Sequence, residues 1–144
     1  MKTYIIHYTK LKDRKKNIND FLSDTNFERY IKEAIKNSPD DWDFIFLGEG
    51  CGIDFINKKI NDDRFEVINK NCVKAKHPAT NCAEAYLVNK ESAKKIYDSI
   101  IPFNITSDWE LAYQFYKLNM NVYWYIPPIF YQGSKTGKYN SELR

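Results

Sequence analysis

The sequence predicts an α/β domain with a mostly parallel sheet flanked by helices. Strand-like segments at 3–8, 83–88 and 122–126 each adjoin a segment with helical periodicity. Strands that alternate with helices are typical of βαβ units, in which neighbouring strands run parallel. The length of 144 residues fits a single domain, 1–144, built around one core.

The front half begins with a strand and two helices. Residues 3–8 (TYIIHY) are β-branched and aromatic, which favours a buried strand, and a lysine-rich amphipathic helix follows. Thr25 and Glu28 have the spacing of a capping box, so a second helix is expected to about Asn37. Pro39 ends this helix, because proline disfavours a helical residue before it.

The middle of the chain predicts short strands joined by turns. Residues 42–47 (WDFIFL) form a clear strand, followed by glycines at 48–52 that permit unusual backbone angles or close approach of a ligand. Their spacing is neither that of a P-loop nor that of a dinucleotide fingerprint. Short strands are expected at 65–68 and 73–76, with a turn at 69–71.

The rear half predicts two capped helices between two strands. Asn89 follows the strand at 83–88 and is expected to cap the first helix. Ser107 is expected to cap the second helix, with Glu110 completing a capping box. The last strand, 122–126, leads into two prolines that block its continuation.

Composition and charge favour a soluble globular protein. The chain is 43% hydrophobic and 28% charged, and its formal net charge is only +3 with both signs interspersed. A dedicated nucleic-acid binder would show a basic patch or stripe, so this class ranks last and rests on the lysines at 10–16. The three cysteines have no metal-type spacing, no signal peptide is visible, and no apolar run is long enough for a membrane span. We therefore expect a soluble, cytoplasmic protein in a reducing compartment.

Several segments, in this order along the chain, carry a family resemblance: IIHYTKLKDR, PDDWDFIFLGEG, AYLVNKESAKKI, ITSDWEL and YIPPIFYQGSKTG. They resemble family 25 glycosyltransferases, which include bacterial lipooligosaccharide transferases and collagen galactosyltransferases. The resemblance implies a GT-A-like, Rossmann-like three-layer domain, reduced in size. It also implies transfer of a hexose from a UDP-sugar donor to a hydroxyl of a glycan or protein acceptor.

The resemblance also implies an Asp-x-Asp metal motif that binds a divalent cation, Mn²⁺ or Mg²⁺, on a strand before residues 42–47. This chain passes from its first helices directly to that strand, so the middle of the usual domain is shortened. Asp41 and Asp43 satisfy the Asp-x-Asp pattern and are the candidate metal ligands. They stand at the start of a strand, whereas ligands in open α/β sheets bind beyond the carboxyl ends.

Asp108 is the candidate catalytic base or acceptor-positioning group, because the resemblance places an acid there. Glu110 is the second catalytic candidate. Both have a structural alternative, since acids in the first turn of a helix are favoured by the helix dipole and by capping.

Nucleotide contacts are implied by the resemblance for residues after the first strand, and further candidates line the cleft mouth. The donor-binding candidates are Thr9, Lys10, Arg14 and Gln132. Lys135 and Ser141 are expected to line the cleft mouth together with Gln132. Glu49 and Asp54 flank the glycine turn and are either substitutes for the missing metal motif or ordinary turn acids, and His77 is a loop histidine with no partner at ligand spacing. The aromatic run 123–125 offers either a sugar-stacking face or core packing. The alternative function is a non-catalytic remnant of the same fold that acts as a binding or interaction module.

Overall fold

The computed structural model describes residues 26–48, 65–76, 83–131 and 137. Contacts divide the chain into two units, Met1–Glu33 and Ala34–Arg144. Of the first unit, the described part is the beginning of helix α2 (Phe27–Asn37), and the fold below is that of the second unit. The strand predicted at 3–8, the lysine-rich helix and the cap at Thr25 lie outside the described residues.

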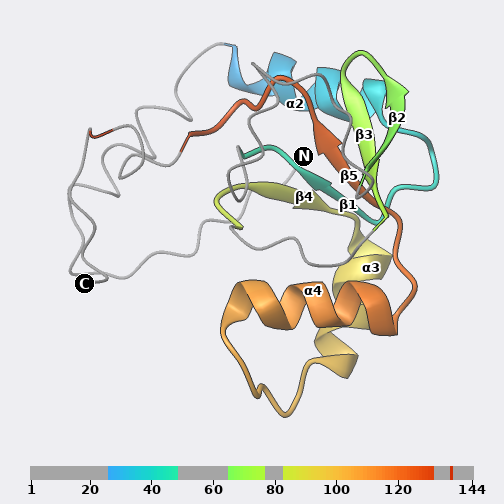
Figure 1. The fold of residues 1–144 in the computed structure, drawn as a ribbon, viewed down its shortest axis with the longest axis vertical. Coiled ribbons are helices and arrows are strands. Elements are labelled where there is room, and N and C mark those ends of the chain that lie inside the picture. The colour runs from blue at the N-terminus through green and yellow to red at the C-terminus, as the bar shows by residue number, and fades with distance from the viewer. Residues whose placement is uncertain (1–25, 49–64, 77–82, 132–136, 138–144) are drawn as a thin grey trace. The chain divides into compact units, whose positions relative to one another are not determined.

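Five strands form one sheet: β1 (Phe44–Phe46), β2 (Phe65–Asn69), β3 (Cys72–Ala75), β4 (Tyr86–Val88) and β5 (Val122–Tyr125). Their order across the sheet is β2-β3-β5-β1-β4 (Figure 1). Within the described sheet β1 and β5 pair in parallel, whereas the β1–β4, β2–β3 and β3–β5 pairs are antiparallel. The α/β class is confirmed, but the described sheet is mixed and mostly antiparallel, so the expectation of a mostly parallel sheet is wrong for these strands.

The antiparallel arrangement at the β2 edge follows from a tight turn. The backbone N–H of Asn71 donates to Oδ1 of Asn69 at 2.8 Å, which closes the reversal between β2 and β3. The side-chain amide of Asn71 then donates to the carbonyl oxygen of Ile126 at 2.7 Å and ties the turn to the end of β5. Parallel strands need a crossover of about a dozen residues, so a turn this short permits only antiparallel pairing.

Two of the helices were predicted close to their observed bounds. Helix α3 spans Lys90–Ser99, and its N-cap Asn89 accepts a hydrogen bond from the backbone N–H of Ser92 at 2.8 Å, as expected. Helix α4 spans Ser107–Lys117, but its N-cap is Thr106, which makes no side-chain capping bond. The predicted capping box is therefore wrong, and the Glu110 side chain turns to the buried face of the helix instead.

The core lies between the sheet and the helices α3 and α4. Phe46 stacks on Trp124 with ring centroids 4.4 Å apart, and Phe44 packs on Phe115 of α4 at 4.7 Å. Ile96 of α3 joins the same buried cluster. These buried aromatic rings contribute substantially to stability, since each removes about 150–250 Å² of surface from water.

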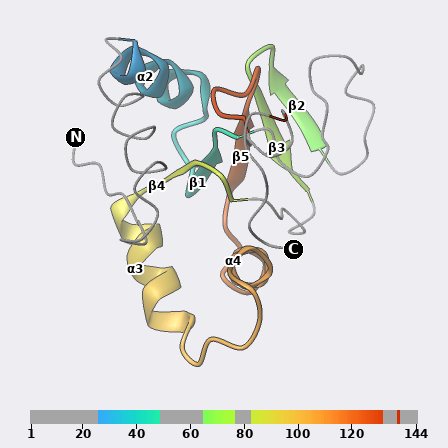
Figure 2. The ribbon, with the colours of Figure 1, turned by 90° about the vertical axis from the view of Figure 1, so that its left-hand side faces the viewer.

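The end of α2 packs on the opposite face of the sheet. Cys72 and Val73 point to opposite faces because successive residues of a strand alternate. Val73 belongs to the core beneath α3 and α4, whereas the thiol of Cys72 lies 3.9 Å from Oγ of Ser38. Helices α3 and α4 lie on one face of the sheet (Figure 2), and the end of α2 contacts the other face.

The parallel pair of β1 and β5 defines an amino end and a carboxyl end of the sheet. A short connection joins the end of α4 to the start of β5, and α4 runs back along the sheet (Figure 1). The start of α4 therefore lies on the side toward which β1 and β5 run, and its last turn lies where β5 begins.

Candidate functional site

The carboxyl end of the parallel pair is extended beyond the two strands. The carbonyl oxygen of Leu47 accepts hydrogen bonds from the backbone N–H groups of Ile129 and Phe130, at 2.9 and 3.1 Å. Gly48 and Phe130 form a further parallel bridge. The chain after the two prolines thus returns to the end of β1, where ligands of open α/β sheets bind.

Glu84 lies against this strand end. A Cβ atom on Gly48 would stand 2.8 Å from Oε2 of Glu84 and 3.3 Å from its Cβ, so a side chain there would displace the carboxylate. Both carboxylate oxygens of Glu84 are shielded from solvent. Glycine at position 48 therefore allows an acidic side chain to pack directly beside the end of β1.

Sequence reasoning missed Glu84. The signal was present, because Glu84 is a single acid between Ala83 and Ala85 at the beginning of an otherwise apolar segment. Its proximity to Gly48 is set by the antiparallel pairing of β4 with β1, which the sequence pattern did not predict.

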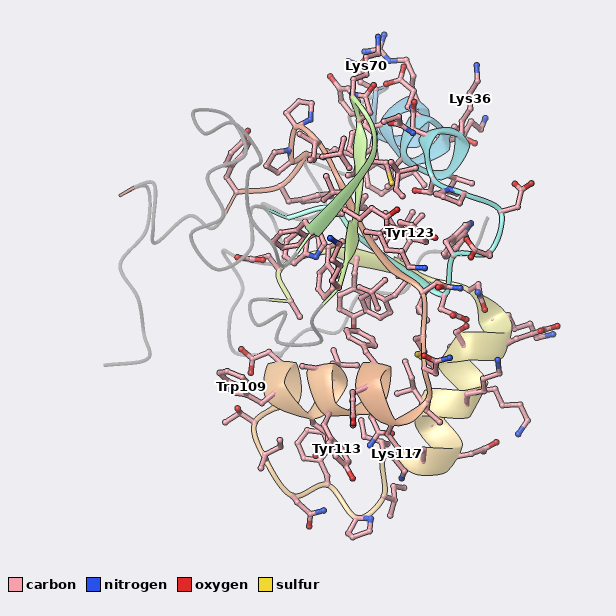
Figure 3. All side chains as sticks on the ribbon, turned by 45° about the vertical axis from the view of Figure 1, so that its right-hand side comes forward. Lys36, Lys70, Trp109, Tyr113, Lys117 and Tyr123 are labelled. Atoms are coloured by element: carbon pink, nitrogen blue, oxygen red, sulfur yellow. The ribbon has the colours of Figure 1, made fainter. Side chains whose placement is uncertain are left out.

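Asp108 lies in the first turn of α4, on the same side of the sheet. Its Oδ1 accepts a hydrogen bond from the backbone N–H of Trp109 at 3.1 Å, and the side chain is half-buried. The neighbouring Trp109 is 48% exposed at the start of the helix (Figure 3). In Figure 1 the start of α4 and the segment that leads into β4 lie on the same side of the domain. The Gly48–Glu84 contact and the first turn of α4 thus both lie on the side of the sheet toward which β1 and β5 run.

Glu110 is placed differently from Asp108. It is only 3% exposed, and its Oε1 accepts a hydrogen bond from Nε2 of Gln114, one turn later, at 2.8 Å. The pair belongs to the inner face of α4, so the geometry gives Glu110 a packing role, and its predicted catalytic role gains no support.

Asp43, one of the two predicted metal ligands, accepts hydrogen bonds from protein groups through both carboxylate oxygens. Its Oδ1 accepts from the hydroxyl of Ser92 in α3, and its Oδ2 accepts from the backbone N–H of Asn121 at 2.8 Å. The carboxylate therefore links the start of α3 to the segment that leads into β5.

Asp41 makes a second set of bonds at the same place. Its Oδ1 accepts from the hydroxyl of Tyr123 at 2.8 Å and its Oδ2 from the side-chain amide of Asn121 at 3.0 Å. Burial of the phenol, together with the Asp41 carboxylate, raises the pKa of Tyr123 well above its ordinary value. The two aspartates act here as anchors of the amino end of the parallel pair.

The structure does not bring the predicted metal ligands and the predicted base together. Asn121, which bonds to Asp41 and Asp43, lies just beyond the last turn of α4, whereas Asp108 lies in its first turn. The 11 residues of α4 separate these points by roughly 16 Å at about 1.5 Å per residue. Carboxylates that bind the same hard cation each place an oxygen atom about 2 Å from it, so two carboxylates this far apart cannot share one ion. Nor do three metal-ligating side chains cluster anywhere in the described part of the chain.

The remaining candidates divide into buried residues and residues outside the described part. Tyr123, Trp124 and Tyr125 are all buried, so they pack within the domain and offer no sugar-stacking face. The other candidates lie outside the described residues: Thr9, Lys10, Arg14, Glu49, Asp54, His77, Gln132, Lys135 and Ser141.

No helix in the described part of the chain has the length and apolar character needed to cross a membrane. The sequence matches no family model, and neither curated proteins nor solved structures gave a significant match.

Proposed function

We propose that this chain binds a UDP-sugar beyond the carboxyl ends of β1 and β5 and transfers its hexose to a hydroxyl of a glycan or protein. Two observations support the proposal: Glu84 packs beside Gly48 at the end of β1, and Asp108 and exposed Trp109 begin the helix that starts on the same side of the sheet. The family resemblance of the segment around Asp108 supplies the reaction class.

Asp108 is the proposed general base. Its carboxylate takes the proton of the acceptor hydroxyl as the acceptor oxygen bonds to the anomeric carbon of the hexose. The bond between that carbon and the diphosphate oxygen breaks, and UDP leaves with the electron pair. A base positioned in this way contributes about 10²–10⁴-fold to the rate.

Trp109 and Glu84 are proposed to position the donor sugar. The exposed ring of Trp109 offers an apolar face against which one side of a hexose packs, and its position next to Asp108 sets the sugar beside the base. Glu84 packs against Gly48 with both carboxylate oxygens shielded from solvent, so it supports the end of β1 against which the donor is proposed to lie.

A divalent cation does not fit the acids that the structure describes. Asp41 and Asp43 already accept hydrogen bonds from protein groups, and they lie at the amino end of the sheet. The proposed transfer therefore includes no step that uses a metal ion.

Release of UDP from UDP-glucose and UDP-galactose, with and without a glycan acceptor, tests the proposal. The D108N variant is expected to lose at least about 100-fold in rate. The E84Q variant is expected to raise KM more than it lowers kcat. Asp98, an exposed acid on α3 that pairs with Lys94, provides the matched control D98N, which should keep full activity. Equal rates in D108N and the unchanged chain would overturn the assignment.

The second candidate is the binding module without transfer. The structural use of Asp41 and Asp43 favours it, because these acids hold the fold together whether or not chemistry occurs. Calorimetric titration with UDP and manganese separates the candidates: binding without UDP release supports the module. Absence of any binding at millimolar ligand would contradict both.

A further inference from the structure

A pocket lies at the other end of α4 from Asp108. It has a volume of about 370 Å³ and is formed where β3 ends, α4 ends and β5 begins. Small-molecule sites in proteins have volumes of about 300–1,000 Å³, so this pocket has room for a ligand of the size of one sugar ring with a substituent.

The floor of the pocket belongs to the hydrophobic core. Phe115 and Val122 line it and are buried, and Met120 packs against the same cluster. The backbone N–H of Met120 donates to the carbonyl oxygen of Phe115 at 2.9 Å, which fixes the chain as it leaves α4. Asn119 takes a left-handed conformation there, with φ of 49°, so the turn that forms this wall is well defined.

The rim of the pocket is polar and carries an excess of positive charge. Lys74 lies in β3 and Lys76 follows its last residue, and Glu66 stands directly opposite Lys74 in the register of β2 and β3. The Lys74 ammonium also lies 5.7 Å from the centroid of the Tyr123 ring, a cation–π distance. Glu66 thus offsets Lys74, and exposed Lys76 supplies the remaining positive charge at the mouth.

The rest of the rim suits hydroxyl groups and an apolar ring face. Asn119 and Asn121 line the pocket; the Asn121 amide already donates to Asp41, whereas the amide of Asn119 is of a kind that both donates and accepts hydrogen bonds. Tyr116, which is largely exposed, adds an aromatic ring with a hydroxyl at its tip. One wall is therefore aromatic and the opposite rim is cationic.

We propose that this pocket binds a hexose that carries a single anionic group, either a carboxylate or a phosphate. The anionic group pairs with Lys76, the apolar face of the ring packs on Tyr116 and Met120, and the ring hydroxyls bond to Asn119. This site goes beyond the proposed transfer and does not depend on it, because it lies at the other end of α4 from Asp108.

The test is an NMR titration of the full chain with glucose 6-phosphate, glucuronate and neutral glucose. We expect at least one of the two anionic sugars to shift the backbone amides of 74–76 and 116–121. Glucose should bind at least about tenfold more weakly, as expected from the loss of one charge-assisted hydrogen bond. The anion that binds more tightly identifies the group as phosphate or carboxylate.

Two variants and a matched control complete the test. K76M should weaken binding of the preferred anion about tenfold and leave the affinity for glucose unchanged. Y116A should weaken binding of all sugars that bind. K95M, which removes an exposed lysine of α3 outside the pocket, should change neither affinity. The proposal is overturned if no amide of the pocket shifts at about 20 mM ligand, above the millimolar range of weak sites. It is also overturned if glucose binds as tightly as both anions, or if K76M and K95M behave alike.

Discussion

Replacement of Asp43 by alanine is the sharpest test of the structural role given to the Asp-x-Asp pattern. The change removes the acceptor for the Ser92 hydroxyl and for the backbone N–H of Asn121. Ser92 is buried, so its hydroxyl would be left without this partner away from water. Hydrogen bonds to charged groups contribute about 1.5–3 kcal/mol each, and the site is partly exposed. We therefore expect D43A to lower the free energy of unfolding by roughly 3–4 kcal/mol.

Urea unfolding in the presence of a chelator measures this directly. D43N keeps the shape of the side chain and one acceptor, so its loss should be smaller, about 1–2 kcal/mol. D40A removes a neighbouring exposed acid and should stay within about 0.5 kcal/mol of the unchanged chain. If Asp43 were a metal ligand without a structural role, D43A and D40A would have the same free energy of unfolding in the presence of the chelator. That result would refute the reasoning.

Three further predictions follow from the described contacts. N89A removes the cap of α3 and the bond from the Asn89 amide to the Trp42 carbonyl oxygen, and should cost about 1–2 kcal/mol in urea unfolding. Y123F should cost about 1 kcal/mol at neutral pH. Because folding raises the pKa of Tyr123, the unfolded phenol ionises first, at about pH 10, and stability falls as the pH rises further. Y123F should flatten this alkaline decline, and an unchanged slope would contradict the assignment. Burial raises the pKa of the Cys72 thiol, so in a variant whose other cysteines are serine a disulfide reagent should react rapidly only after unfolding.

The positions of the described elements were largely predictable, because they depend on local patterns. The aromatic and β-branched runs at 42–47 and 122–126 contain the observed strands β1 and β5. Asn89 caps α3 as expected, since its side chain needs only the backbone three residues later. Local hydrogen bonding and side-chain periodicity determine such features within one short segment.

Strand direction was not predictable in the same way. Alternation of apolar residues identifies a strand but contains no information on its neighbours. The placement of β3 between β2 and β5, antiparallel to both, depends on the tight turn at Asn69 and on contacts with a strand far along the chain. The turn at 69–71 was predicted from the sequence, but the antiparallel pairing of β2 and β3 that it enforces was not.

In the candidate site, too, some positions follow from the local sequence, whereas others depend on pairing between distant segments. The placement of Asp108 at the start of a helix follows from its own segment, whereas the position of Glu84 beside Gly48 depends on the pairing of β1 with β4. Glu110 was assigned to a capping box from its spacing. The helical period that brings Glu110 and Gln114 to the buried face of α4 outweighed that local preference.

The most direct test of the central claim is to locate UDP-glucose on the chain by its effect on backbone amide signals. The proposed function predicts that the shifts concentrate at Gly48, Glu84, Asp108, Trp109 and Phe130, and that D108N binds the nucleotide sugar without releasing UDP. Shifts confined to 74–76 and 116–121, or no shifts at millimolar UDP-glucose, would contradict a donor site at the carboxyl end of β1 and β5.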